Sequence, residues 1–334
     1  MKPKQQYFPV FLTTIRANLI QTFDIFIKLK GNIVLYHSGG DNFTSEVRKK
    51  LIENKVGVVY IPERDKGEYN NYLVDNLSIL TRDNSVSMED KTKILHYSVK
   101  TVAHQFFNKP DIQTIPFFKN TVSKMTDLIL LDDEVLYNLV RMASNSHETY
   151  IHSINVGVFG TGLAKFILGN DSKHDIKKIS EGLFFHDIGK TFIPPEIINK
   201  NAPLNHNEWN LVKQHPLEGY KILNHLNTTD AEIKIIVMQH HERNSGKGYP
   251  MGLKGDQIHL YSKICSIADS FEALTSSRPY RNKLESSFNA LLILKNEMMK
   301  EIDPDIFQQF VKLFSESAKK PSNKTTVTIS KPSF

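Results

Sequence analysis

Hydrophobic and polar positions follow two different patterns along the chain. Up to about residue 67, short apolar runs are separated by turn residues, which is typical of strands. Lys30-Gly31-Asn32 lies between two such runs and predicts a β-hairpin, and Thr44 is expected to cap a short helix. We therefore expect a small α/β domain over residues 1–67, with strands at residues 7–12, 24–29, 33–36 and 55–61. Its residues form no catalytic pattern, so we interpret it as a regulatory or docking domain.

Beyond this domain, apolar residues recur at three- and four-residue spacing, the pattern of amphipathic helices. Residues 68–114 are predicted to form a helical connector, with a polar break at 81–87. Residues 115–318 are predicted to form an all-helical domain, and the polar residues 319–334 a flexible tail. The fold class is therefore mainly α, with helices expected at 112–125, 133–143, 150–168, 175–185, 207–226, 230–241, 261–275 and 286–300.

The composition limits the class of protein. A chain of 334 residues that is 40% hydrophobic and 23% charged suits a globular protein of two domains. Its single cysteine, Cys265, excludes an internal disulfide and fits a reducing compartment, so we expect a cytoplasmic protein. We expect neither a membrane span nor a signal peptide. The net charge of +6 suits an anionic ligand such as a nucleotide, but the scattered basic residues argue against a nucleic-acid partner.

Histidines and acids recur within the apolar helical segments. Glu148 and His152 are four residues apart and share one helix face. His186 and Asp187 end a strongly apolar run, where an unpaired carboxylate would be costly unless it met a cation. Neighbouring residues on a helix point about 100° apart, so a His-His pair suits two adjacent metals. Each residue alone is more commonly structural, but together they predict a metal centre whose candidate ligands are Glu148, His152, His186, Asp187, His215, His240, His241 and Asp269.

The types of these residues indicate the chemistry. Mixed imidazole and carboxylate ligands suit iron, manganese or zinc, and the lack of cysteine ligands argues against a structural zinc. Two or more adjacent metals suit hydrolysis of a phosphate ester, because they lower the pKa of a bound water and hold the attacking and leaving oxygens. Lys190 and Arg278 would meet the charge of the substrate phosphate.

The same residues form longer motifs. His186-Asp187-Ile188-Gly189-Lys190, followed by His215-Pro216, His240-His241-Glu242-Arg243, Gly248-Tyr249-Pro250 and residues 268–281, resembles the HD-GYP family, a branch of the HD-domain phosphohydrolases. The resemblance covers residues 145–285 approximately. It implies a helical HD fold, two or three metal ions (iron or manganese), and hydrolysis of the bacterial messenger cyclic di-GMP to pGpG or GMP by attack of a metal-bound hydroxide.

The resemblance also implies roles for single residues. Asp187 would bridge two ions, and Glu148 matches the extra acid of members that hold a third metal. Lys190 matches the lysine beside the scissile phosphate, so Asp187 and Lys190 are the expected catalytic residues. The expected substrate contacts are Lys190, Tyr249, Arg278 and Arg281.

Asn244 and Ser245 depart from the family pattern, which usually has an aromatic residue and an acid at these positions. Their presence is expected to leave the Gly248-Tyr249-Pro250 loop more mobile and to slow turnover. Two alternatives therefore stay open. One is the same metal centre acting on another cyclic dinucleotide. The other is a low-turnover module that senses cyclic di-GMP or docks a signalling protein through this loop or the N-terminal domain.

Overall fold

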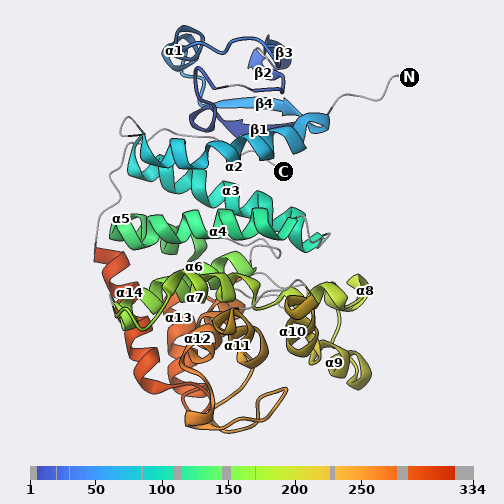
Figure 1. Cartoon of the computed structure of the whole chain (residues 1–334), viewed down its shortest axis with the longest axis vertical. Helices are drawn as coiled ribbons and strands as arrows, with labels where there is room; N and C mark the ends of the chain where they lie inside the picture. Colours follow the sequence, from blue (N-terminus) through green and yellow to red (C-terminus); the bar gives the residue numbers. More distant parts are fainter. Residues whose placement is uncertain are drawn as a thin grey trace. The chain divides into compact units, whose positions relative to one another are not determined.

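The chain is mainly helical with one small sheet, as predicted (Figure 1). The computed structural model describes residues 6–19, 21–29, 31–83, 86–108, 114–144, 152–169, 171–225, 230–276 and 285–319. These residues divide into two compact units after Thr101. Helix α3 (Met88–Asn108) crosses this division, so the expected boundaries at residues 67 and 114 stay predictions. The expected tail beyond Lys319 lies outside the described residues.

The first unit contains a four-stranded antiparallel sheet in the order β1-β4-β2-β3. The predicted hairpin is confirmed, because β2 and β3 pair with Leu29 opposite Asn32. All four expected strands are present, although the last begins three residues later than expected. Their bounds are β1 (Tyr7–Phe11), β2 (Ile25–Leu29), β3 (Asn32–His37) and β4 (Val58–Pro62).

Two helices accompany the sheet. In α1 (Ser45–Glu53) the hydroxyl of Thr44 accepts a hydrogen bond from the backbone N–H of Val47 at 3.3 Å, so the predicted cap is confirmed. Helix α2 (Lys66–Arg82) contributes Tyr69 and Leu73 to the core that also holds the inward-facing side chains of the strands. Short 3₁₀ turns, η1 (Leu12–Thr14) and η2 (Glu63–Asp65), connect these elements.

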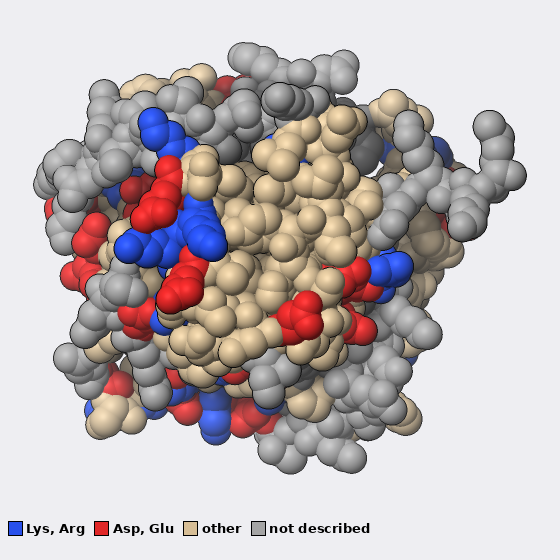
Figure 2. All heavy atoms as spheres, turned by 90° about the horizontal axis from the view of Figure 1, so that it is seen from above, with Lys and Arg blue, Asp and Glu red and all other residues tan. Residues whose placement is uncertain are grey.

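The outer face of the sheet is also largely apolar. Successive strand residues alternate between faces, so the register places Pro9, Tyr60, Phe26 and Leu35 in one row across the four strands. Leu35 is 52% exposed. Figure 2 looks down on the molecule from above the view of Figure 1 and shows a broad central area without charged side chains. The expected regulatory or docking role of this domain stays a prediction.

The second unit consists of helices. Helix α6 is buried on all sides from His152 to Ala164 and packs against α7 and α12, while α7 also packs against α4 and α11. None of the described helices is long and apolar enough to span a membrane. The helices after α3 are α4 (Thr114–Leu131), α5 (Asp133–Ser144), α6 (His152–Leu168), α7 (Ile176–Phe185), α8 (Pro195–Ile198), α9 (His206–Val212), α10 (His215–His225), α11 (Ala231–Gln239), α12 (Leu260–Thr275), α13 (Ser287–Glu297) and α14 (Pro304–Lys319).

One expected helix, residues 207–226, is wrong as a single element. It divides into α9 and α10, with a turn at Lys213 and Gln214. Pro216 has no N–H to donate to the carbonyl of Val212, so the helical hydrogen bonding cannot continue across this point. That carbonyl instead accepts from the His215 ring at 2.7 Å, and the break thus turns a histidine inward. Helices α8 and α14 were not among the expected helices, although both begin within the expected helical domain.

Candidate metal centre

The candidate ligands are brought together because helix ends converge. Seven of the candidate ligands are among the described residues. Six of them lie at the first residue of a helix or within two residues after a helix ends, and Asp269 lies within α12. Six of the seven are buried, and His241 is half-buried. The structure places side by side His152, His186, Asp187, His215, His240, His241 and Asp269.

Asp187 lies at the middle of this cluster. Its Oδ2 is 3.3 Å from Nε2 of His152 and 3.4 Å from Nε2 of His186. Its Oδ1 is 3.3 Å from Nε2 of His215 and 3.7 Å from Nε2 of His240. The described ligand atoms therefore form two groups that share Asp187, one with His152 and His186, and one with His215, His240 and His241.

Asp269 connects the same two groups from α12. Its Oδ1 is 3.2 Å from Nε2 of His152, which belongs to the first group. Its Oδ2 is 3.7 Å from Nδ1 of His241, which belongs to the second. Two carboxylates thus lie between two sets of imidazoles, an arrangement suited to a pair of adjacent cations.

Backbone carbonyls fix the orientation of three histidine rings. Nδ1 lies 2.8 Å from the carbonyl of Leu183 in His186 and 2.9 Å from that of Val237 in His240, and His215 makes the contact with Val212 described above. A carbonyl only accepts, so each Nδ1 carries the proton and donates it. Each Nε2 therefore turns an unshared electron pair toward the centre of the cluster.

Glu272, one turn after Asp269 on α12, was given no role by the sequence. Its carboxylate is fully buried and contacts Nδ1 of His152. It also accepts from the side chains of Asn155 at 3.2 Å and Ser276 at 2.5 Å. A carboxylate behind a metal-binding imidazole fixes its tautomer and raises its basicity. Its three-residue spacing from Asp269 was the available signal, because such residues share a helix face.

The protonation states suit metal binding. Burial lowers the pKa of His215 to about 3 and also lowers that of His240. Burial and the neighbouring His240 hold the pKa of His241 well below its usual value. For Asp187, burial acts to raise the pKa, but the Lys190 ammonium and the neighbouring rings of His186 and His152 outweigh it and hold that pKa well below its usual range. Neutral imidazoles and ionised carboxylates are the forms that bind metals.

Lys190 lies beside this centre on the 3₁₀ turn η4 (Ile188–Phe192). Its Nζ is 2.6 Å from Oδ2 of Asp187, and its side chain is 29% exposed, so it faces both the cluster and solvent. The turn lies tightly against α10 because residue 189 is glycine. A Cβ there would be 1.9 Å from the carbonyl oxygen of His215 and 2.5 Å from the nitrogen of Gly219.

The loop that carries Tyr249 covers His241. The two rings stack with centroids 4.7 Å apart, and the Tyr249 N–H donates to the His241 carbonyl at 3.2 Å. The buried carboxylate of Glu242 accepts from the backbone N–H groups of Met251 at 2.7 Å and Leu253 at 2.8 Å. A Cβ on Gly248 would lie 2.4 Å from the nitrogen of Arg243, so this tight return also requires glycine.

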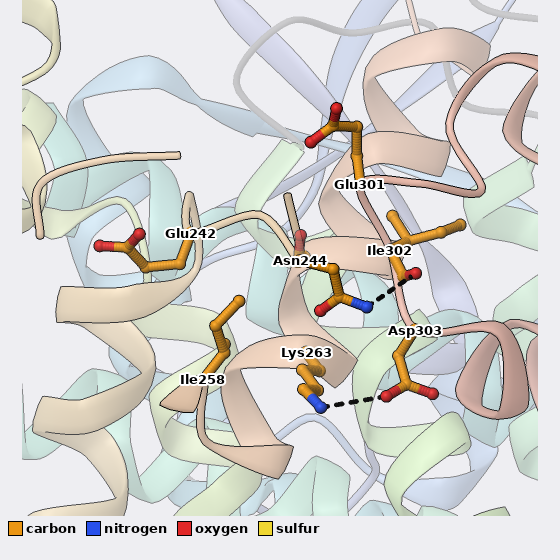
Figure 3. A pocket seen from close by; sticks show the side chains of 8 residues that line it. Glu242, Asn244, Ile258, Lys263, Glu301, Ile302 and Asp303 are labelled. Atoms are coloured by element: carbon orange, nitrogen blue, oxygen red, sulfur yellow. Dashed lines mark hydrogen bonds and ion pairs between the residues drawn. The ribbon is translucent and has the colours of Figure 1, made fainter. Parts of the chain in front are cut away.

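Asn244 and Ser245 fasten the base of this loop to the segment between α13 and α14. The backbone N–H of Asn244 donates to the Glu301 carbonyl at 3.0 Å, and its side-chain amide donates to the Ile302 carbonyl at 3.0 Å. The Ser245 hydroxyl contacts the Glu301 carboxylate. Figure 3 shows Asn244, Glu301 and Ile302 beside a small pocket, where Lys263 pairs with Asp303 at 3.1 Å. The expected extra mobility of the loop stays a prediction. The contacts of Asn244 and Ser245 with Glu301 and Ile302 nevertheless hold the base of the loop.

Three of the expected site residues lie outside the described residues: Glu148, Arg278 and Arg281. A third metal at Glu148 and phosphate contacts at the two arginines therefore stay predictions.

Comparison with known proteins supports the fold of the second unit. The family model described as HD domain matches residues 168–306, a range that includes Asp187, His215 and Asp269 but begins after His152. Bd1817, an HDG"Y"P protein from Bdellovibrio bacteriovorus, has a structure that aligns with a TM-score of 0.63 at 20% sequence identity, covering 93% of this chain and 100% of that chain.

Two curated relatives cover shorter parts of the chain. Cyclic di-GMP phosphodiesterase PA4108 of Pseudomonas aeruginosa is 32% identical over 193 residues, 57% of this chain and 45% of that protein. The 3'3'-cGAMP-specific phosphodiesterase 2 of Vibrio cholerae is 35% identical over 167 residues, 49% of this chain and 31% of that protein. The chain thus spans less than half the length of these relatives. Residues 168–306 match the HD-domain family model, and the resemblance indicated by the motifs is confirmed.

Proposed function

We propose that this protein is a metal-dependent phosphodiesterase that hydrolyses cyclic di-GMP to pGpG or GMP. The observation that carries the proposal is a set of electron-pair donors facing one another without protons between them. Nε2 of His215 and Nε2 of His240 are 3.1 Å apart, while the Nδ1 protons of both rings point outward to carbonyls. Oδ1 of Asp187 is buried without a hydrogen-bond donor among the described residues.

Such a cluster is stable only with positive charge at its centre. Lone pairs at these distances repel, and an unpaired buried carboxylate oxygen is costly. Lys190 approaches Oδ2 of Asp187, not Oδ1, so one side of the carboxylate needs another cation. The donor set therefore fits two metal ions that share Asp187, and we propose iron or manganese because imidazole and carboxylate ligands suit both. A third ion would require Glu148.

When bound, adjacent metals activate water and neutralise charge in phosphodiester hydrolysis. The residues of this chain would then orient the substrate. Lys190 is half-exposed beside Asp187, where its ammonium would pair with a phosphoryl oxygen as negative charge develops. Tyr249, packed on His241, would form the adjoining wall. We propose Arg278 and Arg281 as further phosphate contacts.

The proposed substrate follows the substrates for which the relatives are named. Relatives from Pseudomonas aeruginosa and Thermotoga maritima are named as cyclic di-GMP phosphodiesterases, at 32% and 34% identity. The Vibrio cholerae relative named for 3'3'-cGAMP is 35% identical. Identity alone does not separate these substrates, so 3'3'-cGAMP is the second candidate. We also propose action in the cytoplasm, which the single cysteine suits.

The test is chromatographic analysis of products. Protein purified without oxygen and loaded with Fe(II) or Mn(II) is incubated separately with cyclic di-GMP and 3'3'-cGAMP. We expect pGpG or GMP from the first, and a loss of about a thousand-fold in Asp187→Asn, because a metal's contribution amounts to several kcal/mol. Asp127→Asn, an exposed carboxylate on α4, is the matched control and should keep full activity.

Other outcomes assign the alternatives. Cleavage of 3'3'-cGAMP alone would replace the substrate. Tight binding of cyclic di-GMP by fully loaded protein without any product would contradict the enzyme and favour a sensing or docking module.

A further inference from the structure

Trp209 is the only tryptophan in the chain, and it lies beside the candidate metal centre. It belongs to α9 and is 45% exposed. Its ring meets the ring of Tyr249 in an edge-on contact, with centroids 6.3 Å apart and planes at 78°. Only part of the indole is therefore covered by the protein.

Tyr249 connects this indole to the metal-binding histidines. The tyrosine ring stacks on His241 and also lies edge-on to His215, at a centroid distance of 6.2 Å. Trp209 is thus one ring away from two histidines of the second ligand group. In a nucleotide, the base is one sugar away from its phosphate, so a base can reach the indole while the phosphate lies at Asp187 and Lys190.

The charged residues near Trp209 on α9 differ in their pairing. Glu208 pairs with Lys200 at 2.6 Å. Lys213, four residues after Trp209 and hence on the same side of α9, forms no ion pair with any described residue. An exposed indole with an unpaired ammonium nearby presents the two groups that bind single nucleotides, a stacking surface and a cation.

We propose that Trp209 is the stacking surface for one purine base of the substrate, with Lys213 facing the same nucleotide. This inference rests on the proposed function and adds a base-binding subsite to it. Stacking of a base on an aromatic side chain tolerates different bases, so the subsite would accept either guanine or adenine. Its contribution would be to substrate binding, while the groups around Asp187 act on the phosphodiester.

The first test uses the single tryptophan as a reporter. Stacking of a purine on Trp209 should quench the fluorescence of the metal-loaded protein on rapid mixing with cyclic di-GMP or with GMP. Inorganic phosphate, which reaches the metal centre but has no base, should leave it unchanged. Because GMP is included, the subsite is tested even if cyclic di-GMP is not a substrate. Unchanged fluorescence with both GMP and cyclic di-GMP would overturn the inference.

The second test separates binding from chemistry. Trp209→Ala should raise KM for cyclic di-GMP by about ten-fold, within the range that alanine substitutions of stacking residues produce, and Trp209→Phe should restore most of it. The value of kcat for cyclic di-GMP and the metal content after dialysis should change little in Trp209→Ala, because the substitution removes a binding surface and no group at the metal centre. Phe166→Ala is the matched control, because Phe166 is an exposed aromatic residue about 21 Å along α6 from His152.

The outcomes are decisive in both directions. An unchanged KM in Trp209→Ala, while the wild type hydrolyses cyclic di-GMP, would overturn the inference and leave the proposed function intact. A loss of kcat together with a loss of metal in Trp209→Ala would also overturn it, because these losses would indicate damage to the metal centre.

Discussion

The two units of this protein differ in the free-energy cost of the polar atoms that they bury without a hydrogen-bond partner. In the first unit, the described buried side-chain atoms without a hydrogen-bond partner include amide atoms of Gln21 and Asn70, which are neutral. In the second, they include a carboxylate oxygen of Asp187, surrounded by imidazoles. An unpaired buried amide costs a few kcal/mol, whereas an unpaired buried charge costs far more. The buried carboxylate of Asp187 in the second unit therefore calls for a cation, whereas the neutral amides of Gln21 and Asn70 do not.

Removal of metal should give the largest difference between the two units, because it should destabilise the second and leave the first unchanged. A ligand at a thousand times its dissociation constant stabilises the state that binds it by about 4 kcal/mol. Chelation should therefore increase amide hydrogen exchange in α6, α7, α11 and α12 while β1–β4 keep their protection. Equal loss of protection in both units would contradict the assignment of the metal centre to the second unit alone.

A matched pair of glycine substitutions should give the next largest difference in stability between the two units. Gly189→Ala forces a Cβ against the backbone of His215 and Gly219, and should destabilise the second unit by about 3 kcal/mol and reduce metal content. Gly67→Ala, in the first turn of α2, meets nothing within 4 Å and should stabilise the first unit by about 0.5–1 kcal/mol. Urea unfolding measures both changes. A tolerated Gly189→Ala would show that η4 can move away from α10.

Loss of the carboxylate behind His152 should weaken the metal centre without unfolding it. Glu272→Gln removes the negative charge and places an amide NH₂ among hydrogen-bond donors such as the side chain of Asn155. This change should reduce metal affinity by about 10- to 100-fold. Metal content after dialysis is the measurement. Glu53→Gln, an exposed carboxylate on α1, is the matched control in the first unit and should keep the full metal content.

Acid should destabilise the metal-free second unit through its buried histidines. The folded pKa of His215 is about 3, below the value near 6.5 in an unfolded chain, so the unfolded state binds the extra proton between these values. Stability is then lost as pH falls from 6.5 toward 3, by up to about 1.4 kcal/mol per pH unit for this residue. His215→Gln should reduce the slope measured by urea unfolding between pH 6.5 and 5.5. His225→Gln, at the exposed end of the same helix, should leave it unchanged.

Periodicity predicted most of the fold because buried faces repeat at the spacing of strands or helices. The hairpin, the Thr44 cap and the buried α6 all follow from local sequence. The break at Lys213 and Gln214 did not follow from periodicity, because the helical spacing of apolar residues continues through it. Pro216 was the local signal that the backbone hydrogen bonding is interrupted.

The candidate ligands were predictable because their types and motif positions are chemically distinctive. The contacts behind them were not. The outward Nδ1 hydrogen bonds, the Glu272–His152 contact and the attachment of Asn244 to Ile302 depend on groups that meet only after the helices pack. Asn244 lies 58 residues from Ile302, and no local pattern specifies such a pairing.

The 120 residues between His152 and Glu272 also set an order of events during synthesis. At about 5–20 residues per second, a ribosome needs on the order of 6 to 24 seconds to pass from one to the other. The strands of the first unit, all made before residue 63, have time to pair within that interval. The histidine at the start of α6 must wait in the nascent chain for its carboxylate, so the cluster is complete only after Glu272 has been made.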